Sequence, residues 1–141
     1  FRIDARSRLK LLFDGGVYTE LDANLGSTDP LEFVDSKPYK QRLKDMQKNV
    51  GLKDALVSAE GRMDGRLVVV CIMELQFIGG SMGSVVGEKI TRCIERSMAL
   101  NAPLVIVSAS GGARMQEGAI SLMQLAKISA ALMRLDEARI P

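Results

Sequence analysis

The pattern of apolar and polar positions changes near residue 54. Before it, apolar residues are scattered among charged ones, and their spacing predicts short amphipathic helices at residues 5–13 and 39–49. Residues 27–30 (Ser-Thr-Asp-Pro) predict a helix start or a turn, because an aspartate that can cap a helix precedes a proline suited to the first helical position. We therefore expect residues 1–53 to be a helical segment ahead of a core at residues 54–141.

After residue 54 the apolar positions come in unbroken runs, which suit strands buried on both faces. Strands are predicted at residues 55–63, 67–73 and 104–108. Asp64-Gly65 separates the first two, and this dipeptide is a strong signal for a tight hairpin. Helices are predicted at about residues 85–100 and 115–137, each after a Gly-Gly pair. Strands that alternate with helices predict an α/β fold.

The two Gly-Gly pairs belong to an internal repeat. Strand, Gly-Gly, helix and then proline occur twice, and Gly111-Gly112 follows Gly79-Gly80 at a distance of 32 positions. Ala102-Pro103 leads into a strand, and Ile140-Pro141 has the form of the same lead-in. A spiral of strand–strand–helix units is the natural architecture for such a repeat. We expect the domain to continue beyond residue 141.

The predicted last helix is unusually apolar. Four of its polar residues fall on one narrow stripe: Ser121, Gln124, Lys127 and Arg134. The rest is apolar nearly all round, which is typical of a helix buried on most sides. A chain this short can hardly cover it, so we expect a partner subunit or the remainder of the domain to do so. Lys127 either extends its charge to solvent or pairs with that partner.

Composition narrows the chemistry more than the fold. The 19 basic and 17 acidic residues are spread evenly, so nothing predicts a nucleic-acid-binding face. No run of about 18 apolar residues predicts a membrane span. Histidine is absent, which excludes a Ser-His-Asp triad, a Cys-His pair and a histidine base within this chain. Cys71 and Cys93 are expected to be buried, reduced thiols, and a metal site needs more ligands than they supply.

The junctions of strand, Gly-Gly and helix are the strongest candidates for a site. Unpaired N–H groups at a helix start, beside glycines that let a ligand approach the backbone, can bind an oxygen that gains negative charge. The spacing differs from a dinucleotide fingerprint and from a Walker loop, and no histidine is present to activate Ser110. We therefore expect the amides of Gly111 and Gly112 to hold a developing oxyanion, with a simple tight turn as the alternative.

Two motifs carry a resemblance to a known family: FIGGSMGSVVGEK at residues 77–89 and SASGGARMQEG at residues 108–118. They resemble the carboxyltransferase β subunit of multi-subunit acetyl-CoA carboxylase, the bacterial and plastid type. Residues 1–6 and 27–31 resemble that family's segment ahead of the core, so the resemblance covers essentially the whole chain. It implies a crotonase-like fold and a location in the bacterial cytoplasm or the plastid stroma.

The resemblance implies transfer of a carboxyl group from carboxybiotin, on a carrier protein, to acetyl-CoA, which gives malonyl-CoA for fatty-acid synthesis. It implies an α subunit of the same fold, usually two of each, together with biotin carboxylase and the biotin carboxyl carrier protein. Coenzyme A would be held largely by β and biotin by α. A basic biotin ureido group would take the methyl proton, which explains the missing histidine. Zinc is expected only with the family's four-cysteine ribbon, which these residues do not contain.

Carried onto this sequence, the family's oxyanion donors are the amides of Gly111 and Gly112. Residues expected to bind the substrate are Gly79, Gly80, Ser81, Met82, Gly83, Ser110, Ala113 and Arg114. Arg114 is expected either to meet the phosphates of coenzyme A or to pair with Glu117, which gives electrostatic support rather than acting as a base. Lys89 is expected on a solvated helix face. A crotonase-type hydratase or isomerase, and a non-catalytic assembly module, stay open as alternatives.

Overall fold

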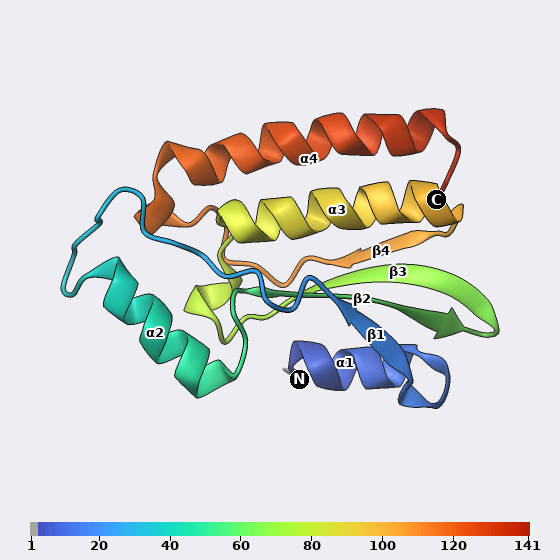
Figure 1. Ribbon diagram of the computed structural model, residues 1–141, viewed down its shortest axis with the longest axis horizontal. Helices are drawn as coiled ribbons and strands as arrows, with labels where there is room; N and C mark the ends of the chain where they lie inside the picture. The colour runs from blue at the N-terminus through green and yellow to red at the C-terminus, as the bar shows by residue number, and fades with distance from the viewer. Residues whose placement is uncertain (1–2) are drawn as a thin grey trace.

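The computed structural model describes residues 3–141 and shows four layers (Figure 1). The helices are α1 (Ala5–Leu12), α2 (Tyr39–Val50), α3 (Ser84–Leu100) and α4 (Ala119–Glu137). The strands are β1 (Tyr18–Leu21), β2 (Leu56–Met63), β3 (Arg66–Met73) and β4 (Leu104–Val107). Single 3-10 turns are η1 (Asp14–Gly16), η2 (Ile78–Gly80) and η3 (Met115–Glu117). Helix α1 packs on one face of the sheet and α3 on the other, with α4 on the outer side of α3.

The strands form one sheet in the order β1-β2-β3-β4. β2 pairs antiparallel with β1 and β3, whereas β3 and β4 are parallel. The predicted hairpin is confirmed: Asp64 and Gly65 have positive φ, and the Asp14 carboxylate accepts hydrogen bonds from their amides at 2.9 and 2.8 Å. Because β3 and β4 are parallel neighbours, their carboxyl ends lie side by side, and α3 forms the connection between the two strands.

Two features outside the site, strands β1 and β4, differ from the sequence-based expectation, and a third resolves an alternative that the sequence left open. Tyr18–Leu21 forms strand β1, although the first 53 residues were expected to be helical. Residues 27–30 lead into a turn, one of the two alternatives, and the Asp29 carboxylate accepts the Phe33 amide at 3.0 Å. Strand β4 is half-buried rather than buried, because among residues 3–141 it has a neighbouring strand on one side only.

The core gathers around β3, whose residues 68–73 are all buried. The prediction for Cys71 and Cys93 is confirmed, since both are free thiols that lie buried in this core. A hydrogen bond with Cys93, together with burial, raises the pKa of the Cys71 thiol well above its usual range, so it stays protonated.

Helix α4 turns its polar stripe toward α3. Ser121 and Gln124 are buried there, and two ion pairs join the helices: Lys127 to Glu88 at 2.5 Å and Arg134 to Glu95 at 3.2 Å. The apolar face is exposed at Leu122, Met123, Leu125, Leu132 and Met133. Within residues 3–141 this face is uncovered, as expected of so short a chain, and what covers it in an assembly stays a prediction.

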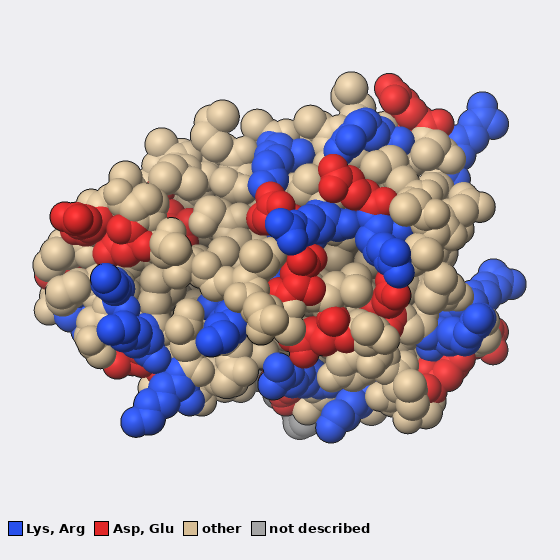
Figure 2. Space-filling view, viewed as in Figure 1, with Lys and Arg blue, Asp and Glu red and all other residues tan. Residues whose placement is uncertain are grey.

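The surface seen in Figure 2 carries both signs of charge close together, as the even composition suggests. Exposed ion pairs account for part of this mixing, among them Arg96 with Glu60 at 2.7 Å. No continuous basic area interrupts this face. Along residues 3–141, no helix combines the length and the apolarity that crossing a bilayer requires.

The contact between α3 and α4 depends on Gly87. A Cβ at this position would lie 2.6 Å from the Cβ of Gln124, closer than packed side chains allow. We predict that Gly87→Ala lowers the free energy of unfolding by about 1–3 kcal/mol, because the added methyl group must push α4 outward. Urea denaturation measures the change. Glu95→Ala, at an exposed position of the same helix, should have a much smaller effect, and equal effects would contradict the packing argument.

Candidate active site

Two glycine loops meet where the parallel strands end. The first glycine loop (residues 78–83) follows β3 and leads into α3, and the second glycine loop (residues 108–114) follows β4. Six hydrogen bonds join them. Two come from the Arg114 side chain to Ser81, and the other four are Gly111 N–H to Gly79 O at 2.9 Å, Met82 N–H to Gly112 O at 2.8 Å, Arg114 N–H to Met82 O at 2.9 Å, and the Ser110 hydroxyl to Gly80 O at 2.7 Å. The two junctions of the repeat thus form a single structural unit.

Gly80 allows the closest approach between the loops. Its φ is +65°, and a Cβ there would lie 2.4 Å from the carbonyl oxygen of Ala109. Gly79 has nearly the same φ, +64°, yet a Cβ there would meet nothing within 4 Å. Both glycines therefore serve the turn, but only Gly80 sets the distance between the two loops.

The proposed oxyanion donors differ in what they already bind. The Gly111 amide donates to Gly79 O, so in this conformation it has no hydrogen left for a ligand. The Gly112 amide donates to the Ser110 hydroxyl at 3.1 Å, a longer and exposed contact. The Ala113 amide has no hydrogen-bond partner within residues 3–141, because Met82 pairs with the residues on either side of it. Free donor capacity therefore lies at Gly112 and Ala113, one position later than predicted.

The predicted site residues all belong to this unit, but their exposure divides them. The exposed ones are Gly79, Ser110, Gly111, Gly112 and Ala113, and Met82 is half-buried. The buried ones are Gly80, Ser81, Gly83 and Arg114. Only the first group can touch a ligand directly in this conformation, whereas the second group can act by shaping the loops.

The Arg114 guanidinium lies at the centre of a buried polar cluster. We call Tyr39, Asp54, Arg114 and Glu117 the Arg114 cluster; each side chain is at most 1% exposed. Arg114 binds both oxygens of Asp54, at 2.7 and 2.9 Å, and pairs with Glu117 at 3.3 Å. Of its two expected roles, the ion pair with Glu117 is present. Contact with a coenzyme A phosphate would require this closed cluster to open, because the guanidinium has no exposed surface.

Glu117 joins the second glycine loop to the start of α3. Its carboxylate accepts the Ser84 amide at 2.6 Å and the Tyr39 hydroxyl at 2.7 Å. A Cβ at Gly83 would lie 2.6 Å from this carboxylate, so glycine is required there for packing. The final helix starts at Ala119 and not at residue 115 as predicted, because η3 and Gly118, with φ +52°, come first. This added turn brings Glu117 to the cluster.

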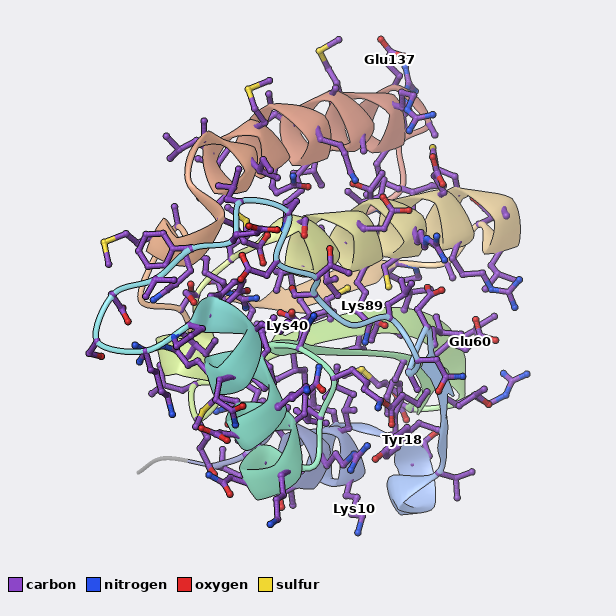
Figure 3. All side chains as sticks on the ribbon, turned by 60° about the vertical axis from the view of Figure 1, so that its left-hand side comes forward. Lys10, Tyr18, Lys40, Glu60, Lys89 and Glu137 are labelled. Atoms are coloured by element: carbon purple, nitrogen blue, oxygen red, sulfur yellow. The ribbon has the colours of Figure 1, made fainter. Side chains whose placement is uncertain are left out.

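The expectation that Lys89 is solvated is wrong. Its side chain is buried, and its ammonium group donates to Leu56 O at 3.0 Å. Figure 3 labels it inside the molecule, near the sheet. Burial lowers the pKa of Lys89. Position 89 lies three residues after Val86 and four before Cys93, both buried, so helical spacing could have placed it on the inner face.

Tyr39 and Asp54 are parts of the cluster that the sequence analysis missed. Asp54 directly precedes a buried strand, and an acidic residue at such a position is a weak signal for a buried partner. Tyr39 lies in a lysine-rich helix of the polar segment, and no local pattern distinguishes it. Its partners are 75 and 78 positions away, so only the tertiary structure reveals its role.

A cavity opens beside the second glycine loop, at the carboxyl ends of β3 and β4. It has a volume of about 330 Å³ and is bounded by Arg8, Met73, Leu75, Gln76 and Ala109, among others. Its lining combines apolar walls with one cation, Arg8, and one carboxylate, that of Glu74, which accepts the amides of Ala5 and Gln76. Among residues 3–141, no three metal-binding side chains come together.

Comparison with known proteins agrees with this geometry. Residues 5–141 match the family model of the carboxyl transferase domain. Two curated relatives are the acetyl-coenzyme A carboxylase carboxyl transferase subunits beta of Citrifermentans bemidjiense and Flavobacterium psychrophilum, 53% and 54% identical. The alignments cover 100% and 99% of this chain, but 50% and 49% of those proteins. The chain therefore spans about half the length of the curated relatives it matches.

Solved structures confirm the predicted crotonase-like α/β fold. Transcarboxylase 12S, with methylmalonyl-coenzyme A and methylmalonic acid bound, gives a TM-score of 0.76 at 29% identity over 94% of this chain and 24% of that one. A Pseudomonas malonate decarboxylase hetero-tetramer in complex with malonate gives 0.73 at 30% identity, over 96% and 48%. Since the family model matches nearly every residue, the chain belongs to the carboxyl transferase domain family.

Proposed function

We propose that this chain works within the β subunit of acetyl-CoA carboxylase carboxyltransferase, which moves a carboxyl group from carboxybiotin to acetyl-CoA and yields malonyl-CoA. The observation that carries the proposal is the joined pair of glycine loops, in a chain more than half identical to proteins of that name along its length. The working unit includes an α subunit, in an α2β2 assembly, with biotin carboxylase and a biotin carboxyl carrier protein.

The thioester oxygen of acetyl-CoA binds at the Gly112 amide in this proposal. That amide now donates to the Ser110 hydroxyl, which an incoming oxygen can replace because the hydroxyl keeps its own bond to Gly80 O. The adjacent Ala113 amide is the second donor. Gly111 contributes by holding the loops together rather than by touching the substrate. Backbone donors held in this way stabilise the oxyanion without reorganising during the reaction.

In this proposal no side chain of this protein acts as the base that removes the proton from acetyl-CoA. Carboxybiotin would supply the carboxyl group as CO2 and leave a ureido base able to take the methyl proton of acetyl-CoA. The enolate carbon would then bond to the carbon of that CO2, and the negative charge would pass from the enolate oxygen, held by the loop amides, to the new carboxylate. The residues of this chain bind, orient and stabilise, which accords with a sequence that has no histidine.

The remaining predicted residues shape the approach of coenzyme A. Gly79 and Met82 line the surface next to the donors, whereas Ser81 and Gly83 act through packing beneath it. In this proposal Arg8, at the cavity next to Ala109, pairs with an anionic group of the substrate, while the Glu74 carboxylate in the same lining stays bound to the amides of Ala5 and Gln76. The face of α4 that carries exposed leucines and methionines is available to the α subunit.

A hydratase or isomerase is a weaker alternative on this geometry. Those reactions need a free carboxylate beside the oxyanion donors. Glu117, the first carboxylate after Gly112, is buried and already binds Tyr39, Ser84 and Arg114. A non-catalytic assembly role would leave the loops in place and predicts that altering their amides changes no rate.

An amide-to-ester replacement at Gly112 tests the proposal, because it removes the N–H group of this residue and adds no side chain. Proline would be a poorer probe, since the φ of Gly112 is +109°. In the full β chain assembled with its α subunit, we expect kcat for malonyl-CoA formation to fall roughly 100-fold. The same replacement at Gly15, at the other end of the sheet, should leave kcat unchanged. Full activity of the Gly112 ester would refute the donor role.

A further inference from the structure

Within residues 3–141, the hydrogen bonds that link helix α2 to the second glycine loop involve one side chain of this helix, that of Tyr39. Tyr39 begins this helix and is completely buried, and its hydroxyl belongs to the Arg114 cluster. The helix lies in the polar segment ahead of the core, far in sequence from either loop. If the Tyr39 hydroxyl supports the glycine loops, the polar segment that contains α2 takes part in the chemistry. If it does not, that segment only covers the domain.

The Tyr39 hydroxyl has one partner for each of its hydrogen-bonding functions. It donates to Oε1 of Glu117 at 2.7 Å and accepts from Nη1 of Arg114 at 3.1 Å. Burial raises the pKa of Tyr39 well above its usual value, so the group remains a neutral donor. Packing alone would be satisfied by a phenylalanine ring, so these two hydrogen bonds call for another explanation.

The charges of the cluster explain why a neutral donor is needed. One guanidinium faces two carboxylates, those of Asp54 and Glu117. Asp54 takes the short, two-pronged contact, and Glu117 is left with a single contact to Arg114 at 3.3 Å. The Ser84 amide and the Tyr39 hydroxyl supply the remaining donors to Glu117. Without the hydroxyl, one oxygen of a buried carboxylate keeps only that long contact.

The Arg114 cluster is hydrogen-bonded to the first glycine loop and includes the last residue of the second, so a displaced Arg114 side chain would affect both loops. Nη2 of Arg114 donates to Ser81 O at 2.7 Å, and its backbone amide donates to Met82 O at 2.9 Å, both in the first loop. Arg114 itself ends the second loop, two residues after Gly112. A change in the position of its side chain therefore alters the spacing of the loops and the direction of the Gly112 amide.

We propose that Tyr39 is a positioning residue for carboxyl transfer, which holds Arg114 and Glu117 so that the two glycine loops present their free amides correctly. Helix α2 is then a working part of the active site. The inference rests on the proposed function and names a residue that acts on the substrate only through the loops.

The test uses Tyr39→Phe in the full β chain assembled with its α subunit. We expect kcat for malonyl-CoA formation to fall roughly tenfold, because a small displacement of donors costs rate, with a smaller change in KM for acetyl-CoA. The dissociation constants of acetyl-CoA and of coenzyme A are measured as well. Coenzyme A lacks the whole acetyl group, so the ratio of the two constants reports on the binding of that group, whose carbonyl oxygen is the acceptor for the loop amides. We expect this ratio to shift about threefold against acetyl-CoA.

Tyr18→Phe is the matched control, because the Tyr18 hydroxyl has no partner within residues 3–141 and lies on β1, away from the loops (Figure 3). We expect Tyr18→Phe to keep the wild-type kcat and the wild-type ratio of dissociation constants. If Tyr39→Phe keeps both as well, the inference is overturned. A rate that falls only as far as the amount of folded, assembled enzyme falls, with an unchanged ratio, also overturns it, since no effect on the donors then remains.

Ser27→Ala provides a second variant if Tyr39→Phe does not assemble. The Ser27 hydroxyl comes from the same polar segment and accepts from Arg114 at 3.1 Å, so its loss should shift the ratio in the same direction by about twofold. An unchanged ratio in Ser27→Ala would overturn the inference. Failure of the proposed function looks different, because the wild-type assembly would then form no malonyl-CoA.

Discussion

Replacing Arg114 with methionine should lower the free energy of unfolding by about 3–5 kcal/mol. Methionine fills most of the space of the side chain but leaves Asp54 and Glu117 buried without a cation. Removing one partner of a buried ion pair costs far more than the pair itself contributes, since the remaining charges keep their desolvation cost. Urea denaturation of the full chain near pH 8 measures the loss, and malonyl-CoA formation should disappear with it.

The pH dependence of the free energy of unfolding of this variant provides an independent test. Protonation removes the uncompensated charge, so the folded variant takes up protons more readily than the unfolded chain. Its stability relative to wild type should therefore recover as the pH falls from 8 toward 5. Arg92→Met is the control, because Arg92 forms exposed ion pairs with Glu88 and Asp22. We expect its free energy of unfolding to change much less than that of Arg114→Met. Equal losses in the two variants would contradict the role given to burial.

The fold was predictable where a segment's own pattern determines its structure. The unbroken apolar run of β3 and the hairpin dipeptide Asp64-Gly65 specify their conformations locally, and the structure has them within a residue of the expected positions. Strand β1 is different, since four half-exposed residues form a strand only because β2 offers a partner, with Thr19 opposite Glu60. No local signal can indicate a strand whose stability comes from a segment 40 residues away.

The orientation of α4 illustrates a similar limit. Its stripe of polar residues was visible in the sequence, and Lys127 was expected either to extend its charge to solvent or to pair with a partner subunit. In the structure the stripe faces α3, where Lys127 and Arg134 meet glutamates of that helix. The glutamates that the stripe meets belong to α3, so the sequence of α4 alone does not indicate which of its faces lies against that helix.

The positions of the two glycine loops were predictable from the sequence, but their individual hydrogen bonds were not. A glycine pair after each predicted strand marked where each loop lies. Gly111 was expected to offer its amide to a ligand, yet Gly79 accepts that amide from the other loop. The partner of Arg114 was likewise open, because Glu117 is three positions away while Asp54 is 60 positions away. Local spacing indicates what a residue can do, and distant residues decide what it does.

Gly80 and Gly79 allow the spacing of the loops to be tested directly. Gly80→Ala should lower malonyl-CoA formation by roughly 100-fold, because the new methyl group would lie 2.4 Å from Ala109 O and must push the loops apart. The same crowding should reduce the free energy of unfolding by about 1–3 kcal/mol. Steady-state assays of the full assembly and urea denaturation measure the two effects.

Gly79→Ala separates this clash from backbone strain. Its φ of +64° almost equals the +65° of Gly80, so an alanine suffers the same unfavourable conformation at either position, but at Gly79 it meets open space. The strain alone should cost about 1–2 kcal/mol in both variants. Activity should therefore fall much further in Gly80→Ala than in Gly79→Ala. Equal activities would show that the rate depends on the turn itself and not on the distance between the loops, and the amide of Gly112 would then need no close support from Gly80.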